Sequence, residues 1–540
     1  MKIELNEEQE RAIAGAASRV ILAGPGSGKT ATITEALART VEGGTTANAI
    51  VAITFTNAAA AELTTRLQER LELETLKLRY CGTIHGYCIR ELQRHRQHNI
   101  AILNEEESDE MLREVAERLR CKTGLPTIRE AVAELLANDP QRIRGLAGLV
   151  AATYRREMLD SGLYSFDLVL HEGLRVIRAA QDPVALLLVD EVQDSAAIDF
   201  QIFSAIAATR RLYIGDRQQA IYGFRGGRAT MDDIMDHNVV TLNRNHRSGV
   251  AICSAANALM GNGTAMKSVR GNPGAVVLTS YETDTDEALG IARRIRREVM
   301  ERNVPVEEIA VLARTHRIVN GVAEQLTTLG IPVETMQPIM YPDDWEKAVA
   351  TLSVFVNPES EYLCRQWLKV MYPEKASLII REAILREENF MDSFALPDPG
   401  QQWDDILTGL ARCAISIESI DLIRQTADEL QDPSGATVLC ALRQKQQTRP
   451  MGAGVACLTF HGAKGREWDN VYIAGLEQET IPGERKNVDE AEERRILFVG
   501  LTRARDSVTM SYCRARREQW GTRKMRPMAP SKFIDSMTNP

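Results

Sequence analysis

The chain has 540 residues and a formal net charge of −9; 44% of its residues are hydrophobic and 26% are charged. This composition is typical of a folded globular protein with a sizeable core, and the length predicts about three to four domains. The negative charge excludes a global positive field, so binding of a polyanion would need a local basic surface. Arginine clusters at 293–297 and 514–517 could form one, or could be solvated faces.

The distribution of apolar residues and cysteines excludes membrane and disulfide-rich classes. No window holds about 18 consecutive apolar residues, so the sequence predicts no membrane span. The N-terminal MKIELNEEQERA is charged and unlike a signal peptide. The nine cysteines are scattered without a C-x-x-C pair, which argues against a zinc site and a disulfide framework. We therefore expect a cytoplasmic protein.

Short apolar runs alternate with helical patterns near the N-terminus. Residues 20–22 predict a strand, and AGPGSGKT predicts a glycine-rich turn before a helix over 31–40. Residues 49–55 (AIVAITF) predict a second strand, followed by a helix over 57–71. This alternation predicts a parallel α/β sheet.

Two long stretches are instead rich in charged helical patterns such as EEESDEMLREVAERLR. The α/β texture returns at 184–190, and a second α/β run begins near 274. The predicted fold class is α/β, with two parallel-sheet cores that each carry a mostly helical insertion. The expected boundaries are 1–92, 93–169 (helical) and 170–247 for the first core, and 248–356, 357–452 (helical) and 453–540 for the second.

A glycine-rich loop between a predicted strand and a predicted helix carries a phosphate-binding signature. It matches G-x-x-x-x-G-K-[ST], except that Ala23 replaces the first glycine. Small residues let backbone N–H groups surround phosphates, Lys29 adds positive charge, and the Thr30 hydroxyl can ligate Mg²⁺. The candidate residues for binding ATP are Gly24, Gly26, Ser27, Gly28, Lys29 and Thr30.

Hydrolysis would also need carboxylates and further cations. Asp190 and Glu191 follow the apolar run LLLV, where Asp190 would hold Mg²⁺ and Glu191 would polarise the attacking water. Taken alone, the pair could equally be charges at a strand end. Arg247 and Arg503 are candidates for neutralising charge on the γ-phosphate. If both cores face one nucleotide, closing the cleft between them assembles the site.

The motifs and their order resemble superfamily 1A helicases of the UvrD/Rep/PcrA type over nearly the whole chain. The resemblance rests on LNEEQERA, GPGSGKT, TFTNAAAAELTTR, GTIHGY, VDEVQDS, IGDRQQAIYGFRGG, LTFHGAKGREWDNVYIAGL and ERRILFVGLTRAR. It implies two RecA-like cores, 1A and 2A, with helical insertions 1B and 2B. It also implies ATP-driven 3′-to-5′ stepping along single-stranded DNA, with binding to the strand or to its junction with duplex.

The resemblance suggests nucleotide roles for further residues. Gln9 would contact adenine, Gln219 would sense the γ-phosphate, and Glu467 would accept a hydrogen bond from a ribose hydroxyl. His246 stands where the family has a tyrosine that stacks on adenine. Lys464 would contact DNA phosphate or a local carboxylate.

Several of these motifs also imply DNA contacts. Aromatic rings can hold bases without reading sequence, although Phe55, Tyr222 and Phe224 could instead be core residues. No cysteine or histidine cluster surrounds His85 or His461, so we interpret these two as DNA-contacting or packing residues rather than metal ligands. The candidate DNA-binding residues are Phe55, Thr56, Asn57, His85, Tyr222, Phe224, Arg225 and His461.

The chain departs from the family pattern in places. Ala58 replaces a lysine, and Ala31 and His246 replace the arginine and tyrosine that clamp adenine. We expect looser base selectivity, with Gln9 carrying more of it. The stretch 357–452 is short for insertion 2B, so we expect strand separation to depend on a partner.

Three functions share these motifs: a translocase or helicase, a nucleotide-gated DNA-binding regulatory subunit, and an inactive scaffold. The intact hydrolytic set argues against the scaffold. A RecB/AddA-type nuclease domain is not expected, so any nuclease would be a separate protein. Compact UvrD-like helicases also occur beside a nuclease in anti-phage systems such as Gabija, where the regulatory role would apply; DNA repair or a mobile element is the other expectation.

Overall fold

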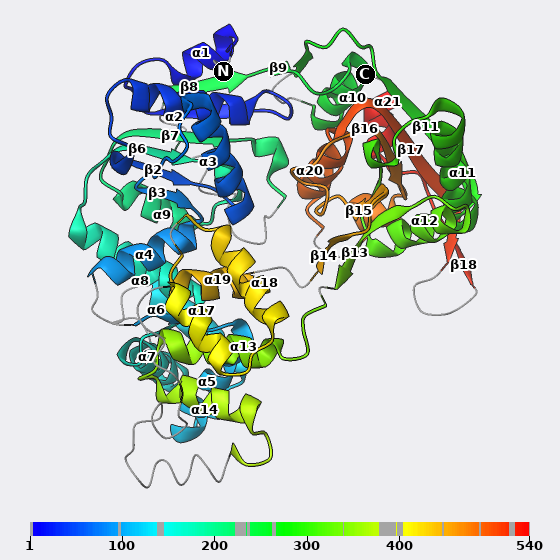
Figure 1. The fold of residues 1–540 in the computed structure, drawn as a ribbon. Coiled ribbons are helices and arrows are strands. Elements are labelled where there is room, and N and C mark those ends of the chain that lie inside the picture. Colours follow the sequence, from blue (N-terminus) through cyan, green and yellow to red (C-terminus); the bar gives the residue numbers. More distant parts are fainter. Residues whose placement is uncertain are drawn as a thin grey trace.

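Two sheets dominate the structure, one on each side of the molecule (Figure 1). The computed structural model describes residues 4–95, 99–137, 145–221, 234, 238–261, 266–338, 340–376, 396, 403–431, 433–444, 448–484, 488–517 and 524–538. The predicted DNA-binding residues Tyr222, Phe224 and Arg225 lie outside the described residues.

The first sheet has six parallel strands in the order β3-β2-β6-β7-β1-β8. Its central strands are almost wholly apolar, as expected where helices cover both faces. The strands are β1 (Arg19–Ala23), β2 (Ile50–Ile53), β3 (Tyr80–Gly82), β6 (Val184–Val189), β7 (Ala208–Gly215) and β8 (Asn238–Leu242). The accompanying helices are α1 (Glu7–Ile13), α2 (Lys29–Glu42), α3 (Asn57–Leu71), α4 (Ile84–His95), α8 (Phe166–Ala180) and α9 (Ala197–Ala205).

The second sheet runs β11-β17-β16-β12-β15-β13-β14, and β18 pairs with β17. All its neighbours are parallel except β14 with β13 and β18 with β17. The strands are β11 (Ala275–Thr283), β12 (Ile309–Ala313), β13 (Val333–Pro338), β14 (Thr448–Met451), β15 (Val455–Thr459), β16 (Trp468–Ala474), β17 (Ala504–Arg517) and β18 (Met525–Pro527). The helices are α10 (Val250–Met260), α11 (Asp284–Arg302), α12 (His316–Thr328), α20 (Glu490–Leu501) and α21 (Phe533–Thr538).

The two cores are joined by a short crossing segment. There β9 (Arg244–Asn245) pairs in parallel with β10 (Lys267–Ser268). The expected α/β class with two parallel-sheet cores is therefore confirmed.

The first helical block lies between α4 and α8 in the chain. It consists of β4 (Ala101–Ile102), α5 (Glu105–Arg118), α6 (Leu125–Ala137), α7 (Gly145–Asp160) and β5 (Leu163–Tyr164). Asn104 forms a capping box with Glu107 at the start of α5, which explains why the acidic run EEESDE begins a helix.

The second helical block begins before the expected position 357, because Leu352 and Phe355 belong to the apolar core that the block's own helices form. Similarly, β14 returns the chain to the second sheet before 453. The block consists of α13 (Trp345–Val356), α14 (Glu361–Met371), α17 (Trp403–Arg412), α18 (Ile417–Asp428) and α19 (Gly435–Gln444).

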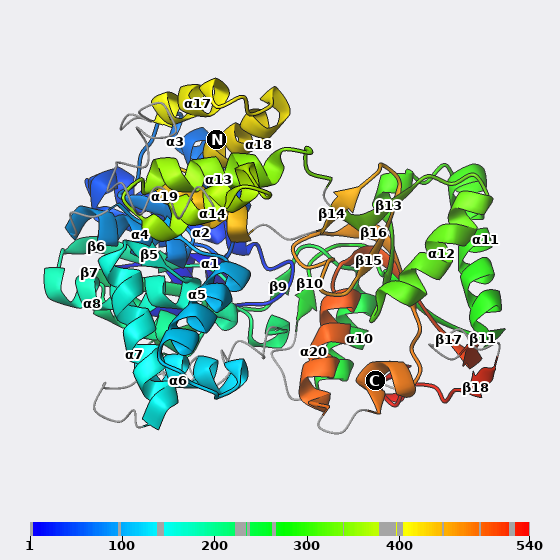
Figure 2. The same ribbon diagram turned by 90° about the horizontal axis from the view of Figure 1, so that it is seen from below.

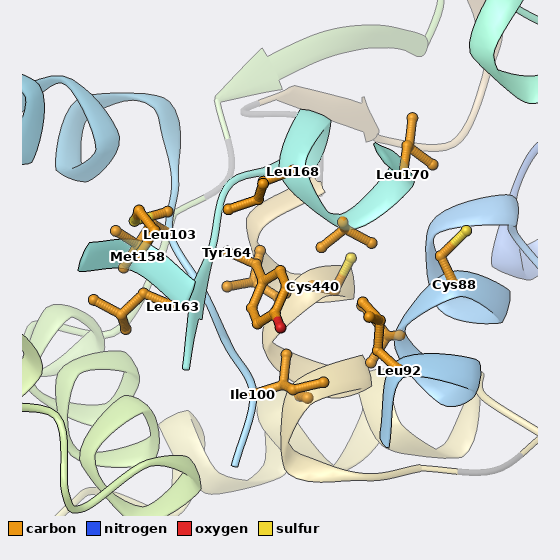
Figure 3. Close-up of a cluster of buried hydrophobic side chains, with 14 of the residues drawn as sticks. Cys88, Leu92, Ile100, Leu103, Met158, Leu163, Tyr164, Leu168, Leu170 and Cys440 are labelled. Carbon is orange, nitrogen blue, oxygen red and sulfur yellow. The ribbon is translucent and has the colours of Figure 1, made fainter. Parts of the chain in front are cut away.

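Although it interrupts the second core, this block packs against the first unit. Cys440 of α19 joins the buried cluster that contains Cys88 and Leu92 of α4 and Tyr164 of β5 (Figure 3). The Tyr362 hydroxyl donates to the Glu107 carbonyl at 2.9 Å. The view from below agrees, since α13, α14 and α17 to α19 lie over the first core (Figure 2).

No helix within the described residues is both long and apolar enough to span a membrane.

Candidate nucleotide and DNA site between the two cores

A cleft of about 930 Å³ lies between the two cores and gathers most of the predicted site residues. Residues from the first core, the crossing segment and the second core all line it. The predicted residues among them are Gly24, Gly26, Ser27, Gly28, Lys29, Thr30, Phe55, Thr56, Asp190, Glu191, Gln219, His246, Arg247, His461, Glu467 and Arg503.

The phosphate loop joins the end of β1 to the start of α2. Gly26 and Gly28 have positive φ angles of 66° and 76°, which explains why glycine stands at both positions. A Cβ atom at Gly28 would lie 2.5 Å from Gln9 Nε2. The backbone of the loop therefore lies close to the Gln9 side chain and lines the cleft.

This loop has the features that an anionic phosphate chain requires. The N-terminus of α2 faces the loop and provides free N–H groups and a positive dipole end. The Ser27 hydroxyl is buried without a hydrogen-bond partner. Thr30 and Asp190 supply oxygen donors, the type that Mg²⁺ prefers. The residues present thus fit a nucleotide with Mg²⁺.

The Lys29 ammonium meets the two carboxylates at the end of β6. Its Nζ lies 3.2 Å from Asp190 Oδ1 and also pairs with Glu191. Burial alone would raise the pKa of Glu191, but Lys29 and Lys464 outweigh it and lower the pKa to about 2. Glu191 is therefore ionised at neutral pH. Its φ of 52° is unusual for a residue with a side chain and is typical of strain held at a functional site.

A continuous hydrogen-bond relay runs from Glu191 to the second core. Gln193 Nε2 donates to Glu191, and Gln193 Oε1 accepts from the Asp216 N–H at 3.0 Å. Gln219 Nε2 donates to Asp216 Oδ2 at 2.8 Å, while Gln219 Oε1 accepts from Arg503 Nη2 at 3.1 Å. The relay connects the Glu191 carboxylate with a cation of the opposite core.

Arg503 is a buried cation held by neutral groups. It is 2% exposed, and its guanidinium donates to the Val499 carbonyl at 2.9 Å as well as to Gln219. Burial and the neighbouring Arg247 lower its pKa to about 9, so it is still charged at neutral pH. No carboxylate of the described residues forms an ion pair with it. Because an uncompensated buried charge is costly, this position suits an anionic ligand.

Arg247 reaches the cleft from the segment between the cores. Its Nε pairs with Glu467, and its Nη1 donates to the Thr502 carbonyl at 3.2 Å. Arg505 holds the same carboxylate at 2.8 Å. Burial alone would raise the pKa of Glu467, but the two arginines keep it below its ordinary value. Glu467 is thus an ionised acceptor at the rim of the cleft.

Gln9 and His246 lie at the end of the phosphate loop where the resemblance expects the base. Gln9 Nε2 donates to the Ser27 carbonyl at 3.1 Å, and Gln9 Oε1 accepts from the Asn6 N–H at 2.9 Å. The His246 N–H donates to the Gly26 carbonyl at 2.7 Å, and its ring nitrogen lies 3.4 Å from Asn6 Nδ2. The Gln9 side chain and the His246 backbone are therefore held against the loop.

The predicted DNA-contacting residues are not all in one place. Phe55, Thr56 and His461 line the cleft, and Lys464 Nζ lies 6.0 Å from the centre of the Phe55 ring. Asn57 lines a separate cavity between the first core and α19. The ring of His85 packs edge-on against Phe166 at 5.7 Å, which favours a packing contribution at this position.

Lys464 contacts a carboxylate, one of its two expected partners. It pairs with Asp194, whose side chain is fully buried. Burial raises the pKa of Asp194 to about 6, although Lys464 opposes the rise. The pair crosses from one core to the other and is a direct link between them.

Sequence reasoning missed three residues of this site. Gln193 and Asp216 carry the relay, and Asn245 fastens the crossing segment by donating to the Pro25 carbonyl at 2.7 Å. All three lie inside the motifs quoted above or beside a predicted residue. Their polar side chains next to buried strands were the available signal.

Comparisons with known proteins cover almost the same span as the motifs. Residues 5–238 match the family model of the UvrD/REP helicase N-terminal domain, and residues 240–391 and 401–515 match the UvrD-like helicase C-terminal domain. The chain is 28% identical to the ATP-dependent DNA helicase UvrD2 of Mycobacterium tuberculosis, over 99% of this chain and 81% of that protein.

Two further relatives match with similar coverage. The chain is 25% identical to DNA helicase II of Haemophilus influenzae, over 98% of this chain and 86% of that protein. It is 23% identical to a probable DNA helicase II homolog of Rickettsia conorii, over 95% of this chain and 93% of that protein. The chain therefore belongs to the UvrD/Rep-type helicases of superfamily 1A, a family of ATP-hydrolysing DNA helicases.

Proposed function

We propose that this protein is an ATP-driven translocase that steps 3′ to 5′ along single-stranded DNA and separates strands at a junction with duplex. The observation that carries the proposal is the relay from Glu191 through Gln219 to Arg503, because it joins hydrolytic residues of both cores. A site shared between two bodies couples hydrolysis to their relative movement.

In this proposal the first core binds the phosphates through the loop and Lys29. Glu191 orients the attacking water, and Arg247 and Arg503 neutralise charge that develops on the γ-phosphate. Gln219 senses the γ-phosphate. Thr30 and Asp190 would hold Mg²⁺, which would supply positive charge to neutralise the phosphates.

The base and ribose would be held at the opposite end of the loop. Gln9 contacts adenine, His246 stacks on one side of it, and Glu467 accepts from the ribose. Since Ala31 offers no opposing side chain of any size, the base is held less firmly than by two clamping residues. Base selectivity then depends mainly on Gln9.

DNA would cross both cores beside the nucleotide cleft. Phe55 and His461, one from each core, supply contacts from the two sides. In the subdomain division that we propose, the first sheet forms 1A and α5 to α7 form 1B. The second sheet forms 2A, and α13 to α19 form 2B.

Displacement of streptavidin from biotinylated oligonucleotides tests the direction. We expect ATP-dependent release from a 5′-biotinylated strand and little release from a 3′-biotinylated one. Lys29→Ala should abolish release, whereas Lys122→Ala, which removes an exposed lysine of the first helical block, should leave it unchanged. Release from the 3′ end alone would contradict the proposed polarity.

A nucleotide-gated regulator of a separate nuclease, as in anti-phage defence, is the alternative function. It would bind DNA according to the nucleotide present but would not displace streptavidin from either end. The same assay therefore separates the two functions. The relay between the cores favours the motor, because it links residues of both cores beside one cleft.

A further inference from the structure

The second sheet ends in a long unpaired edge. Among the described residues, β11 pairs only with β17 and is the terminal strand of the sheet. In a parallel pair, alternate residues point their N–H and C=O groups away from the neighbour, so β11 offers a row of backbone groups to an added strand. Val277 and Leu278 in this strand are 37% and 36% exposed. Its sequence, AVVLTSYET, has one charged residue and no proline.

Helix α11 borders this edge with unpaired positive charge. Arg293, Arg296 and Arg297 are exposed, and none forms an ion pair with a carboxylate of the described residues. Met300, one turn beyond, is 63% exposed. Such a face is unusual in a chain whose net charge is −9. It corresponds to the arginine cluster at 293–297, which the nucleotide and DNA sites do not use.

The arginines and the free edge are neighbours. Gly290 of α11 packs on Tyr281 of β11 so closely that a Cβ at Gly290 would meet the Tyr281 ring. Burial and Glu287 raise the pKa of Tyr281, and the positive charges of Arg294 and Arg297 on α11 oppose the rise. A strand added beside β11 would therefore present every second side chain toward these arginines.

Three of the carboxylates nearby are engaged, whereas Glu301 of α11 is exposed and forms no ion pair with the described residues. Glu282 pairs with Arg514 at 3.0 Å, Asp286 caps the N-terminus of α11, and Glu298 lies 4.0 Å from Arg294. Arg293, Arg296 and Arg297 therefore remain available to an acidic ligand beside the free edge. In both ribbon views α11 lies on the outer side of the second sheet, away from the cleft between the cores (Figures 1 and 2).

We propose that the β11 edge and the arginine face of α11 form a docking site for an extended acidic segment of a partner protein. The segment adds as a strand to β11 through backbone hydrogen bonds and places alternate carboxylates against Arg293 and Arg297. The free strand edge favours a peptide over DNA, since a nucleic acid would leave the backbone groups of β11 unused. The site would tether a partner while the cleft remains accessible.

Fluorescence anisotropy with defined peptides tests the proposal. The probe is labelled Glu-Val-Glu-Thr-Glu-Tyr-Glu-Val-Glu; one control replaces every glutamate with lysine, and a second replaces both valines with proline. We expect the probe to bind at least about tenfold more tightly than either control, because the first loses charge complementarity and the second loses strand pairing.

Two charge-reversal variants locate the binding. Arg293→Glu/Arg297→Glu should weaken binding of the acidic probe by at least about tenfold. Arg156→Glu/Arg412→Glu applies the same charge change to exposed arginines of the helical blocks and should leave binding unchanged. Both variants should keep the ATP turnover of the wild type, since neither touches the cleft.

Hydrogen exchange completes the test. The acidic probe should slow exchange of backbone amides within 275–283. The proposal is overturned if the probe does not bind, if it binds without protecting these amides, or if Arg293→Glu/Arg297→Glu binds it as tightly as the wild type. The last outcome concerns single-stranded oligothymidine in the Lys29→Ala variant, whose motor is blocked. If oligothymidine still competes with the acidic probe there, the arginines bind nucleic acid and the proposal is overturned.

Discussion

The two cores contribute unequally to the site they share. The first brings Lys29, Asp190 and Glu191 together at the ends of β1 and β6, two strands of one sheet that β7 separates. The second supplies charged groups that reach across: Arg503 to Gln219, and Lys464 to Asp194. In the function that we propose, the first core holds the nucleotide, whereas hydrolysis needs both cores.

Removing Lys29 should have the largest effect, because it impairs both nucleotide binding and hydrolysis. Lys29→Ala deletes the cation that meets the phosphates and leaves Asp190 and Glu191 facing each other without a counter-charge. We expect ATP turnover to fall by about 1,000-fold or more and nucleotide binding to weaken. Steady-state hydrolysis measures the turnover, and equilibrium binding of a fluorescent ATP analogue measures the affinity. Turnover above a tenth of the wild-type rate would contradict the assignment.

Removing Arg503 should separate binding from hydrolysis. Arg503→Ala takes away a cation of the second core and leaves the phosphate loop intact. We expect turnover to fall by about 100- to 1,000-fold, while nucleotide affinity changes by less than about tenfold. Arg514→Ala, which removes an exposed arginine of β17, the strand that follows Arg503, is the matched control. Equal losses in affinity and turnover would break the proposed division of labour.

The Lys464–Asp194 pair should have a smaller effect, and one that depends on DNA. Lys464→Ala leaves a fully buried carboxylate without its partner, which is costly. We expect about a tenfold loss of DNA-stimulated turnover. Asp194→Asn in the same chain should restore part of it, because the unpaired charge is then gone. A double-mutant cycle of stimulated rates measures the coupling, and strictly additive losses would show that the pair does not link the cores.

Base selectivity should show the smallest change. Gln9→Ala removes an amide that donates to the Ser27 carbonyl and that we expect to contact adenine. We expect the preference for ATP over GTP to fall by about tenfold, the loss of about one hydrogen bond. The ratio of kcat/KM for the two nucleotides measures it. If a strict ATP preference of the wild type survives the substitution, Gln9 does not carry the selectivity.

Contiguous segments of the sequence predicted the first core's contribution well. The helix over 57–71 and the parallel sheet are confirmed, because local periodicity and strand composition determine both. The loop, Lys29 and the carboxylates follow buried strands, so parallel topology alone brings them to one edge. The residues at this edge were therefore predictable without knowing any long-range contact.

The contacts between distant segments were not predictable in this way. Gln193 and Asp216 form the relay only because β6 and β7 are neighbours, which the sequence does not specify. The start of the second helical block was placed too late, because 345–356 is apolar enough to resemble the core beside it. An amphipathic pattern predicts that α14 and α19 bury one face, but not that they bury it against the first unit.

We propose that DNA binding brings the two cores into a hydrolytic arrangement. The most direct measurement is the rate of ATP hydrolysis with and without saturating single-stranded DNA, in the wild type and in Arg503→Ala. The account predicts strong stimulation of the wild type by DNA and near-complete loss of that stimulation in the variant. A wild-type rate that DNA leaves unchanged, or full stimulation of Arg503→Ala, would contradict it.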